Sequence, residues 1–184
     1  MAALLIFTQR EKNLPFFFFV LLCFATGMFV EIIGINTGYL FGDYSYGEVL
    51  GAKWQGVPFL IGINWFVIVF CAGTIIHRLN EWVYKKIADG KQPSPAVQTF
   101  SFITDAALLT TFFDWIMEPA AIKLGFWKWQ PAGAIPSYNF LCWFLISALL
   151  LTVFRFLTFD KHNQFALHLF IIQALFFLLL QTFL

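Results

Sequence analysis

Five long apolar segments limit what this chain can fold into. A helix needs roughly 20 predominantly apolar residues to cross the hydrocarbon core of a bilayer, and each segment has about that length. Apolar residues make up 60% of the chain and charged residues only 11%, which is outside the usual range of soluble domains. The sequence therefore predicts an all-α integral membrane protein, a bundle of about five transmembrane helices. The predicted helices span residues 14–33, 58–79, 96–119, 138–157 and 165–184.

Residues 1–13 precede the first predicted helix and hold too few apolar residues to cross a membrane. The apolar residues 1–7 come before Arg10 and Lys12, whereas a cleavable signal peptide has its basic residues first. We expect residues 1–13 to be an interfacial stub or the remnant of a longer first helix. The sequence shows no repeat and no low-complexity tract, so residues 1–184 are expected to form a single transmembrane domain.

The Lys and Arg residues predict an orientation for this multi-pass chain in the cell membrane. Basic residues are enriched in cytoplasmic connections. With a cytoplasmic N-terminus, eight of the eleven basic residues fall inside, and the three on the outer side are Lys53, Lys123 and Lys128. We therefore predict that the N-terminus is cytoplasmic and the C-terminus is outside.

Residues 31–58 form the one long stretch whose composition the bilayer does not explain. The stretch contains six glycines and several aromatic residues with polar tips, between two apolar segments. The predicted orientation puts it on the outer face together with residues 120–137. We therefore expect a Gly- and aromatic-rich outer-face loop and the chemistry of the protein at that face.

Four polar side chains, one from each of four predicted helices, lie at a similar depth in the outer half of the bundle. Ionisable residues inside a membrane helix are costly and mark candidate functional sites. This arrangement favours one shared water-bearing cavity over four unrelated polar positions. The alternative for the two asparagines is a role as hydrogen-bonding links between helices. The four residues are Glu31, Asn64, Asp114 and Asn139.

Other carboxylates are less clearly placed by the sequence. Glu118 follows Asp114 by one helical turn, so the two lie on one helix face. Glu118 also lies next to Pro119 at the predicted helix end, where a solvent-exposed side chain is as compatible with the sequence as a functional one. Asp105 precedes Asp114 by nine residues, which places it on roughly the opposite face of a straight helix. Asp43 lies in the outer loop and is a further candidate. The three histidines fall near the inner boundary and are interpreted as interfacial or structural, and the sequence has no cluster of His and Cys ligands.

Four motifs together resemble those of the membrane carotenoid hydratases, the family of carotenoid 1,2-hydratase and bisanhydrobacterioruberin hydratase. The resemblance extends from about Gly27 to Phe144 and depends on the order and spacing of the motifs. The motifs are GMFVEIIGINTGYLFGDYSYGEVLG, GVPFLIGINW, DWIMEPAAIKLGFWKW and PSYNFLCWF.

The resemblance implies addition of water to the terminal C1–C2 double bond of an acyclic carotene such as lycopene or γ-carotene. This reaction needs an acid that protonates C2, and burial keeps a carboxylic acid protonated. It also needs a group that deprotonates the attacking water, and aromatic faces that stabilise a tertiary carbocation. Asp114 is the candidate acid, with Asp43 or Asp105 as the alternative, and Glu31 is the candidate base. Asn64 and Asn139 are candidate hydrogen-bond partners of the water, and the candidate aromatic residues are Tyr39, Tyr44, Trp65, Trp115 and Trp143.

The sequence suggests no metal or organic cofactor for this reaction. The expected partners are a carotenoid, water and the lipid bilayer, with other carotenoid-pathway enzymes as further candidates. The net charge of +1 suggests no nucleic-acid partner. Two alternatives stay open: a carotenoid end-group cyclase, which begins from the same cation, and a protein of another class, either a small transporter or a lipid- or carotenoid-binding subunit.

Overall fold

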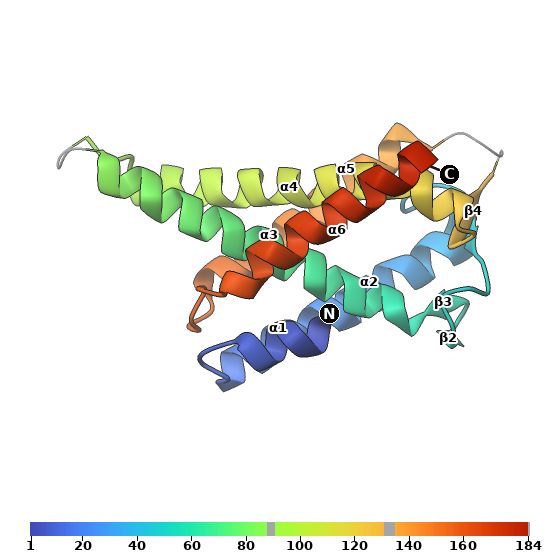
Figure 1. Ribbon diagram of the computed structural model, residues 1–184, viewed down its shortest axis with the longest axis horizontal. Coiled ribbons are helices and arrows are strands. Elements are labelled where there is room, and N and C mark those ends of the chain that lie inside the picture. The colour runs from blue at the N-terminus through green and yellow to red at the C-terminus, as the bar shows by residue number, and fades with distance from the viewer. Residues whose placement is uncertain (88–90, 131–134, 184) are drawn as a thin grey trace.

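The computed structural model describes residues 1–87, 91–130 and 135–183, and within these ranges the chain forms six helices and four short strands (Figure 1). The helices are α1 Ala2–Thr8, α2 Leu14–Thr37, α3 Phe59–Lys86, α4 Pro95–Lys123, α5 Ser137–Phe156 and α6 Gln164–Phe183. The strands are β1 Tyr44–Tyr46, β2 Lys53–Trp54, β3 Val57–Pro58 and β4 Trp127–Trp129. Parts of the two predicted connections 80–95 and 120–137, and Leu184 in the last predicted helix, lie outside the described residues.

Helices α2 to α6 are long and apolar enough to cross a membrane, which confirms the predicted fold class. Helix α3 is the most buried of these five and contacts each of the other helices. Large apolar side chains of α3, including Phe66 and Phe70, pack with those of its neighbours in a continuous core. The bundle is therefore organised around α3.

Three helices extend further than hydropathy predicts. Helix α2 reaches Thr37 and ends at Gly38, whose φ of 68° is the left-handed conformation that glycine adopts readily. Helix α3 continues through the polar residues 80–86, and α4 continues past Pro119 to Lys123. A proline removes one backbone hydrogen-bond donor, but a helix can continue past it. The predicted end of α4 at residue 119 was therefore wrong by about one turn. Hydropathy measures the membrane-embedded part of a helix and does not report these polar ends.

The strands lie at one end of the bundle, at the right in Figure 1, and we call this the strand end. There β1 pairs with β4 in antiparallel register, with Tyr44 opposite Trp129 and Tyr46 opposite Trp127. Gly47 directly follows β1. A Cβ atom at this position would lie 2.0 Å from the carbonyl oxygen of Gly125, so the two loops could not pack this closely with any other residue here. The glycine thus allows the loop after α2 to pack onto the loop after α4.

The opposite end of the bundle contains the connection between α5 and α6, which is bonded to α1. Asn163 caps α6 by accepting a hydrogen bond from the Ala166 backbone N–H at 3.2 Å, and its amide donates to the carbonyl of Leu5 at 3.2 Å. The Gln9 amide donates to the carbonyl of Asp160 at 2.5 Å. Hydrogen bonds to α1 and α6 therefore hold residues 158–163 in place.

Candidate active site

A small polar cavity of about 30 Å³ lies inside the strand end of the bundle. A buried polar space of this size is large enough for water but too small for a large organic group. Helices α2, α3, α4 and α5 and strands β1 and β4 all contribute to its wall. The lining residues are Glu31, Phe41, Tyr44, Tyr46, Ile61, Asn64, Trp65, Asp114, Met117, Glu118, Trp127, Trp129, Asn139 and Trp143.

Glu31 is buried and accepts three hydrogen bonds from aromatic side chains. Its Oε2 accepts from the Tyr44 hydroxyl and, at 2.6 Å, from the Tyr46 hydroxyl, while its Oε1 accepts from Trp65 Nε1 at 3.1 Å. Burial, and then the charge of Glu31, raises the pKa of Tyr44 and of Tyr46 well above the ordinary tyrosine value. Both hydroxyls therefore keep their protons and act as donors to the carboxylate.

Glu118, which the sequence left open between solvent exposure and function, is only 2% exposed. Its Oε2 accepts hydrogen bonds from Trp127 Nε1 at 2.9 Å and Trp129 Nε1 at 3.0 Å. Alternate residues of a strand point to the same face, so the sequence WKW in β4 directs both indoles inward and Lys128 outward. Strand β4 is thus the element that stabilises the Glu118 carboxylate.

Asp114 is the most buried of the three carboxyl groups, at 1% exposed, and has the fewest donors. Asn139 Nδ2 donates to Asp114 Oδ2 at 2.8 Å and reaches Glu118 Oε1 at 3.4 Å. Asp114 and Glu118 are therefore two acids on one face of α4 that share a single amide from α5. Two carboxyl groups this close cannot both be ionised without a large electrostatic cost.

Trp65 and Trp143 stack on each other beside the carboxyl groups. Their ring centroids are 4.0 Å apart and their planes differ by 7°. Gly27 of α2 makes room for this pair, because a Cβ atom there would lie 2.6 Å from the Trp65 ring. The stack fixes the direction of Trp65 Nε1 toward Glu31.

The structure brings seven of the predicted site residues to the cavity and confirms that the four polar residues lie together. The seven residues are Glu31, Asn64, Asp114, Asn139, Tyr44, Trp65 and Trp143.

Four other candidate site residues lie outside the cavity. This corrects the expected places of Tyr39 and Trp115 in the aromatic lining, whereas Asp105 lies on the opposite helix face, as its spacing predicts. Asp105 is exposed and accepts from Ser101 Oγ at 2.9 Å, because nine residues of α4 turn it away from Asp114. Trp115 is exposed because it follows Asp114 by about 100° around the helix. Asp43 is exposed in the residue before β1, with its carbonyl bonded to the Gln130 N–H, and Tyr39 is 79% exposed beyond the end of α2.

Sequence reasoning missed three of the groups that complete the cavity, namely Tyr46, Trp127 and Trp129, and left Glu118 open. A signal was present in the sequence, since YSY and WKW each place two aromatic residues on one face of a short strand. The pairing of these two strands, in which Tyr46 lies opposite Trp127 and Tyr44 opposite Trp129, is visible only in the folded structure.

A second and larger groove of about 400 Å³ lies beside the polar cavity. It is predominantly apolar and runs between α3 and α6, and it is also lined by Met1 and Ala2 and by Leu50 and Phe126 of the loops. Four residues line both spaces and form the boundary between them: Ile61, Asn64, Met117 and Trp127. A groove of this volume is within the size range of sites for small organic ligands.

We predict that Trp129→Phe destabilises the folded protein by about 1–3 kcal/mol, because the buried Glu118 carboxylate loses one of its two indole donors. Thermal or denaturant unfolding of the detergent-solubilised protein measures the change. Trp54→Phe is the matched control, since Trp54 is exposed, and should alter stability by no more than about 0.5 kcal/mol. Equal effects of the two substitutions would contradict a stabilising role of the indole bond.

Comparisons with known proteins agree with the motifs of the sequence. The family model described as "Carotenoid biosynthesis protein" matches residues 1–184. Bisanhydrobacterioruberin hydratase of Haloarcula japonica is 25% identical to this chain over 130 residues, which are 69% of the chain. The chain spans 40% of the length of that relative. No solved structure matches the chain.

Proposed function

This chain belongs to the carotenoid biosynthesis protein family, and from that premise we propose that it is a carotenoid hydratase. The reaction adds water to the terminal C1–C2 double bond of an acyclic end group, as in lycopene or γ-carotene, and gives a tertiary alcohol at C1. The observation that carries the proposal is a water-sized cavity with three buried carboxyl groups directly beside an apolar groove.

Asp114 is the proton donor in this proposal. A carboxylate is stabilised in a buried site by the donors that face it. Among the described residues, Glu31 and Glu118 each accept from two or three side chains, whereas Asp114 accepts only from Asn139. Asp114 is thus the carboxyl group best suited to hold a proton and to deliver it to C2 of the alkene.

Glu31 is the group that positions and deprotonates the attacking water. Its Oε2 accepts from two tyrosine hydroxyls, whereas its Oε1 accepts only from Trp65 Nε1 within the described part of the chain and has capacity for a water molecule. Asn64 reaches the same cavity and can orient that water. The oxygen of the water bonds to C1, one of its protons passes to Glu31, and transfer of a proton from Glu31 to Asp114 through the cavity restores both groups.

The aromatic wall suits a carbocation intermediate. The π-face of an indole or phenol ring attracts a cation by about 0.5–2 kcal/mol, the larger value applying in a dry site. Trp65 and Trp143 cover one face of each other, so at most the other face of each ring can serve this purpose. Tyr44 offers a further ring at the same cavity.

The groove between α3 and α6 is the proposed site of the polyene. The polar cavity alone is too small for an end group, so the end group lies in the groove with its terminal double bond at the boundary formed by Asn64 and Met117. Apolar side chains line the groove, and a long polyene is held among them by burial of apolar surface. In this arrangement the alkene meets the acid and the water at one end of the groove.

Filling the groove tests this arrangement. Ile63→Trp adds a large side chain at a half-exposed groove position and should lower carotene hydration about tenfold or more without lowering the melting temperature. Leu145→Trp adds the same side chain to an exposed position of α5 outside the groove and should leave the rate unchanged. Pigment extraction from a carotene-producing host measures both. Equal rates for the two variants would place the polyene elsewhere.

Pigment analysis of a lycopene-producing host, with and without this gene, tests the function itself. The proposal predicts a product with a tertiary hydroxyl group at one or both ends. A ring at the end group would instead indicate a cyclase, and unchanged pigments would favour a transporter or a binding subunit.

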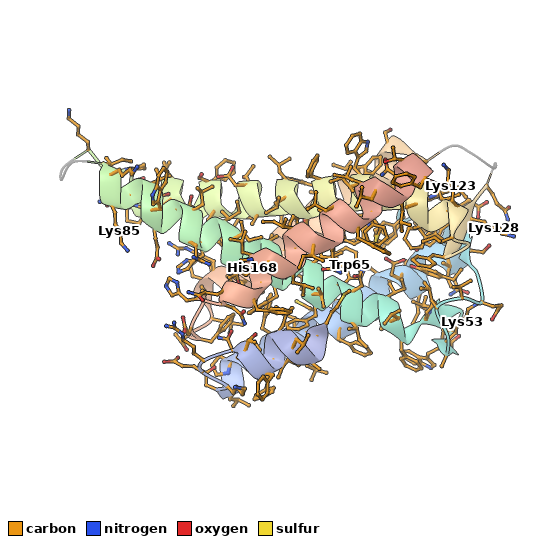
Figure 2. All side chains as sticks on the ribbon, in the orientation of Figure 1. Lys53, Trp65, Lys85, Lys123, Lys128 and His168 are labelled. Carbon is orange, nitrogen blue, oxygen red and sulfur yellow. The ribbon has the colours of Figure 1, made fainter. Side chains whose placement is uncertain are left out.

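The proposed orientation puts the strand end on the outer face of the membrane, where Lys53, Lys123 and Lys128 gather, and Lys85 on the cytoplasmic side (Figure 2). Ser45→Cys at an exposed position of β1 should react with an impermeant maleimide on intact cells, and Lys85→Cys only after the cells are permeabilised. The three native cysteines are buried and give little background. The reverse pattern of labelling would overturn the orientation.

A further inference from the structure

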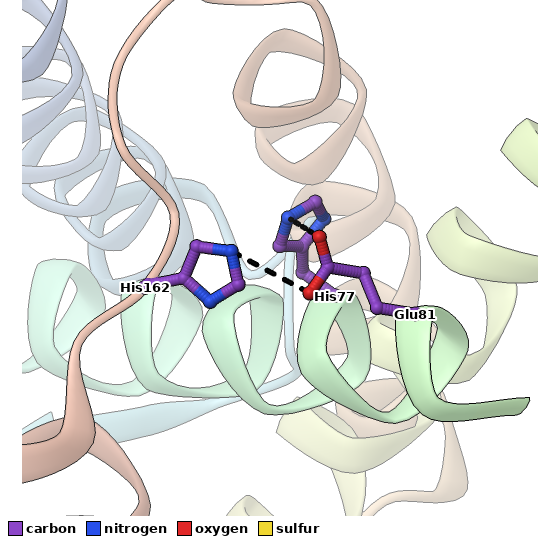
Figure 3. Close-up of side chains that lie close together, drawn as sticks. All are labelled: His77, Glu81 and His162. Carbon is purple, nitrogen blue, oxygen red and sulfur yellow. Dashed lines mark ion pairs between the residues drawn. The ribbon is translucent and has the colours of Figure 1, made fainter. Parts of the chain in front are cut away.

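A second cluster of polar side chains lies at the end of the bundle opposite the carboxyl cavity. His77 and Glu81 are one turn apart on α3, and His162 comes from the connection between α5 and α6 (Figure 3). One ligand atom of each residue lies within 4.8 Å of those of the other two. His77 is 13 residues from Asn64 along α3, or about 20 Å at 1.5 Å per residue, so this cluster is separate from the proposed site of hydration.

The distances within the cluster are too long for ordinary hydrogen bonds. His77 Nε2 lies 3.6 Å from Glu81 Oε1, and His162 Nε2 lies 3.5 Å from Glu81 Oε2. Hydrogen bonds between nitrogen and oxygen are about 2.7–3.2 Å long. Ligands bonded to one tetrahedral zinc ion at about 2.0–2.1 Å lie roughly 3.4 Å from each other. His77 and His162 approach the two different oxygens of the Glu81 carboxylate at separations longer than hydrogen bonds and close to those between zinc ligands, so the three side chains converge on one space.

The backbone segments that carry the three ligands are fixed before any ion binds. Spacing of four residues puts His77 and Glu81 on one face of α3. The His162 backbone N–H donates to Asp160 Oδ1 at 2.8 Å, and the neighbouring Asn163 is buried and bonded to α1. The side chains stay accessible from solvent, since those of His77, Glu81 and His162 are 19%, 39% and 44% exposed. An ion can therefore enter without a rearrangement of the bundle.

We propose that His77, Glu81 and His162 bind one zinc ion, which joins α3 to the connection between α5 and α6. Two imidazoles and one carboxylate are ligands that zinc accepts, with a fourth position open to water. Lys161 and Arg155 lie close enough for their positive charges to act at His77, so these two charges disfavour a cation at the site. Direct bonds to nitrogen must then supply the affinity, which selects zinc over calcium or magnesium, whose preferred ligands are oxygens.

Isothermal titration of the full-length chain in detergent, stripped with a chelator and then titrated with zinc chloride, tests the site. We expect one zinc ion per chain and no measurable binding of magnesium chloride. His162→Ala should weaken zinc binding at least tenfold, and Glu81→Gln should do the same. Zinc in 100-fold excess over its dissociation constant should raise the melting temperature of the native chain by on the order of 5 °C and leave that of His162→Ala unchanged.

His168→Ala is the matched control, because His168 is an exposed histidine of α6 outside the cluster. It should bind zinc as the native chain does. The His162 side chain is itself exposed, and equal melting temperatures of His162→Ala and the native chain in chelator would show that the variant is folded. Absence of zinc binding by the native chain, or equal affinities of the native chain and His162→Ala, would overturn the proposal.

Discussion

Asp114→Asn should lower the rate of carotene hydration by about a thousandfold, within the range of 10²–10⁴ typical of a lost general acid. The amide has nearly the same shape and can still pair with Asn139, but it has no acidic proton to give to the alkene. Hydration is measured as the initial rate of tertiary alcohol formation by membranes that contain equal amounts of each variant.

Asp105→Asn is the control for that experiment, because Asp105 is an acid of the same helix that is exposed and lies outside the cavity. It should hydrate carotene at the native rate. A native rate for Asp114→Asn, or the same large loss for Asp105→Asn, would show that Asp114 is not the acid.

Glu31→Gln should lower the rate about a hundredfold, because the amide can orient a water but cannot accept its proton. Three donors face this side chain, so the amide NH₂ group must also point at a donor, and we expect a lower melting temperature. Rates are therefore compared well below the melting temperature of the variant.

The control for Glu31→Gln is Glu48→Gln in the loop after β1. Glu48 is largely exposed and pairs with Lys53 at 2.7 Å, an interaction worth little at a surface. Its replacement should change neither the rate nor the stability. A native rate for Glu31→Gln would transfer the role of base to Glu118, the other carboxylate of the cavity.

Most of the fold was predictable from hydropathy, because each membrane helix must be apolar over nearly its whole span. All five predicted helices are present, and the errors lie at the polar ends of α2, α3 and α4. The resemblance of four motifs to the membrane carotenoid hydratases is likewise confirmed at the level of the family. Neither signal depends on contacts between distant residues.

The polar residues of the site were partly predictable for the same reason. Glu31, Asn64, Asp114 and Asn139 stand out because polar groups are costly in a membrane, and the structure brings all four to one cavity. Glu118 lies beside a proline near a helix end, where hydropathy does not separate a buried carboxylate from a solvated one. Its burial depends on Trp127 and Trp129, which β1 and β4 bring over it.

The cluster at the opposite end illustrates the limit of spacing arguments. His77 and Glu81 are visible as an i, i+4 pair, but such pairs are common on helices. His162 lies 81 residues further along the chain and reaches them only through the packing of α3 with α6. The three histidines were expected to be interfacial or structural. A zinc ion bound by His77 and His162 would give these two a structural role, because it would join α3 to the connection before α6.

The source of the oxygen atom in the product distinguishes hydration from cyclisation. Membranes that contain the protein are supplied with lycopene in water enriched in ¹⁸O, and the product is analysed by mass spectrometry. Hydration predicts a tertiary alcohol that carries ¹⁸O from the water, formed at a rate that collapses in Asp114→Asn. A cyclic product without oxygen, or an alcohol whose oxygen does not come from water, would contradict the account.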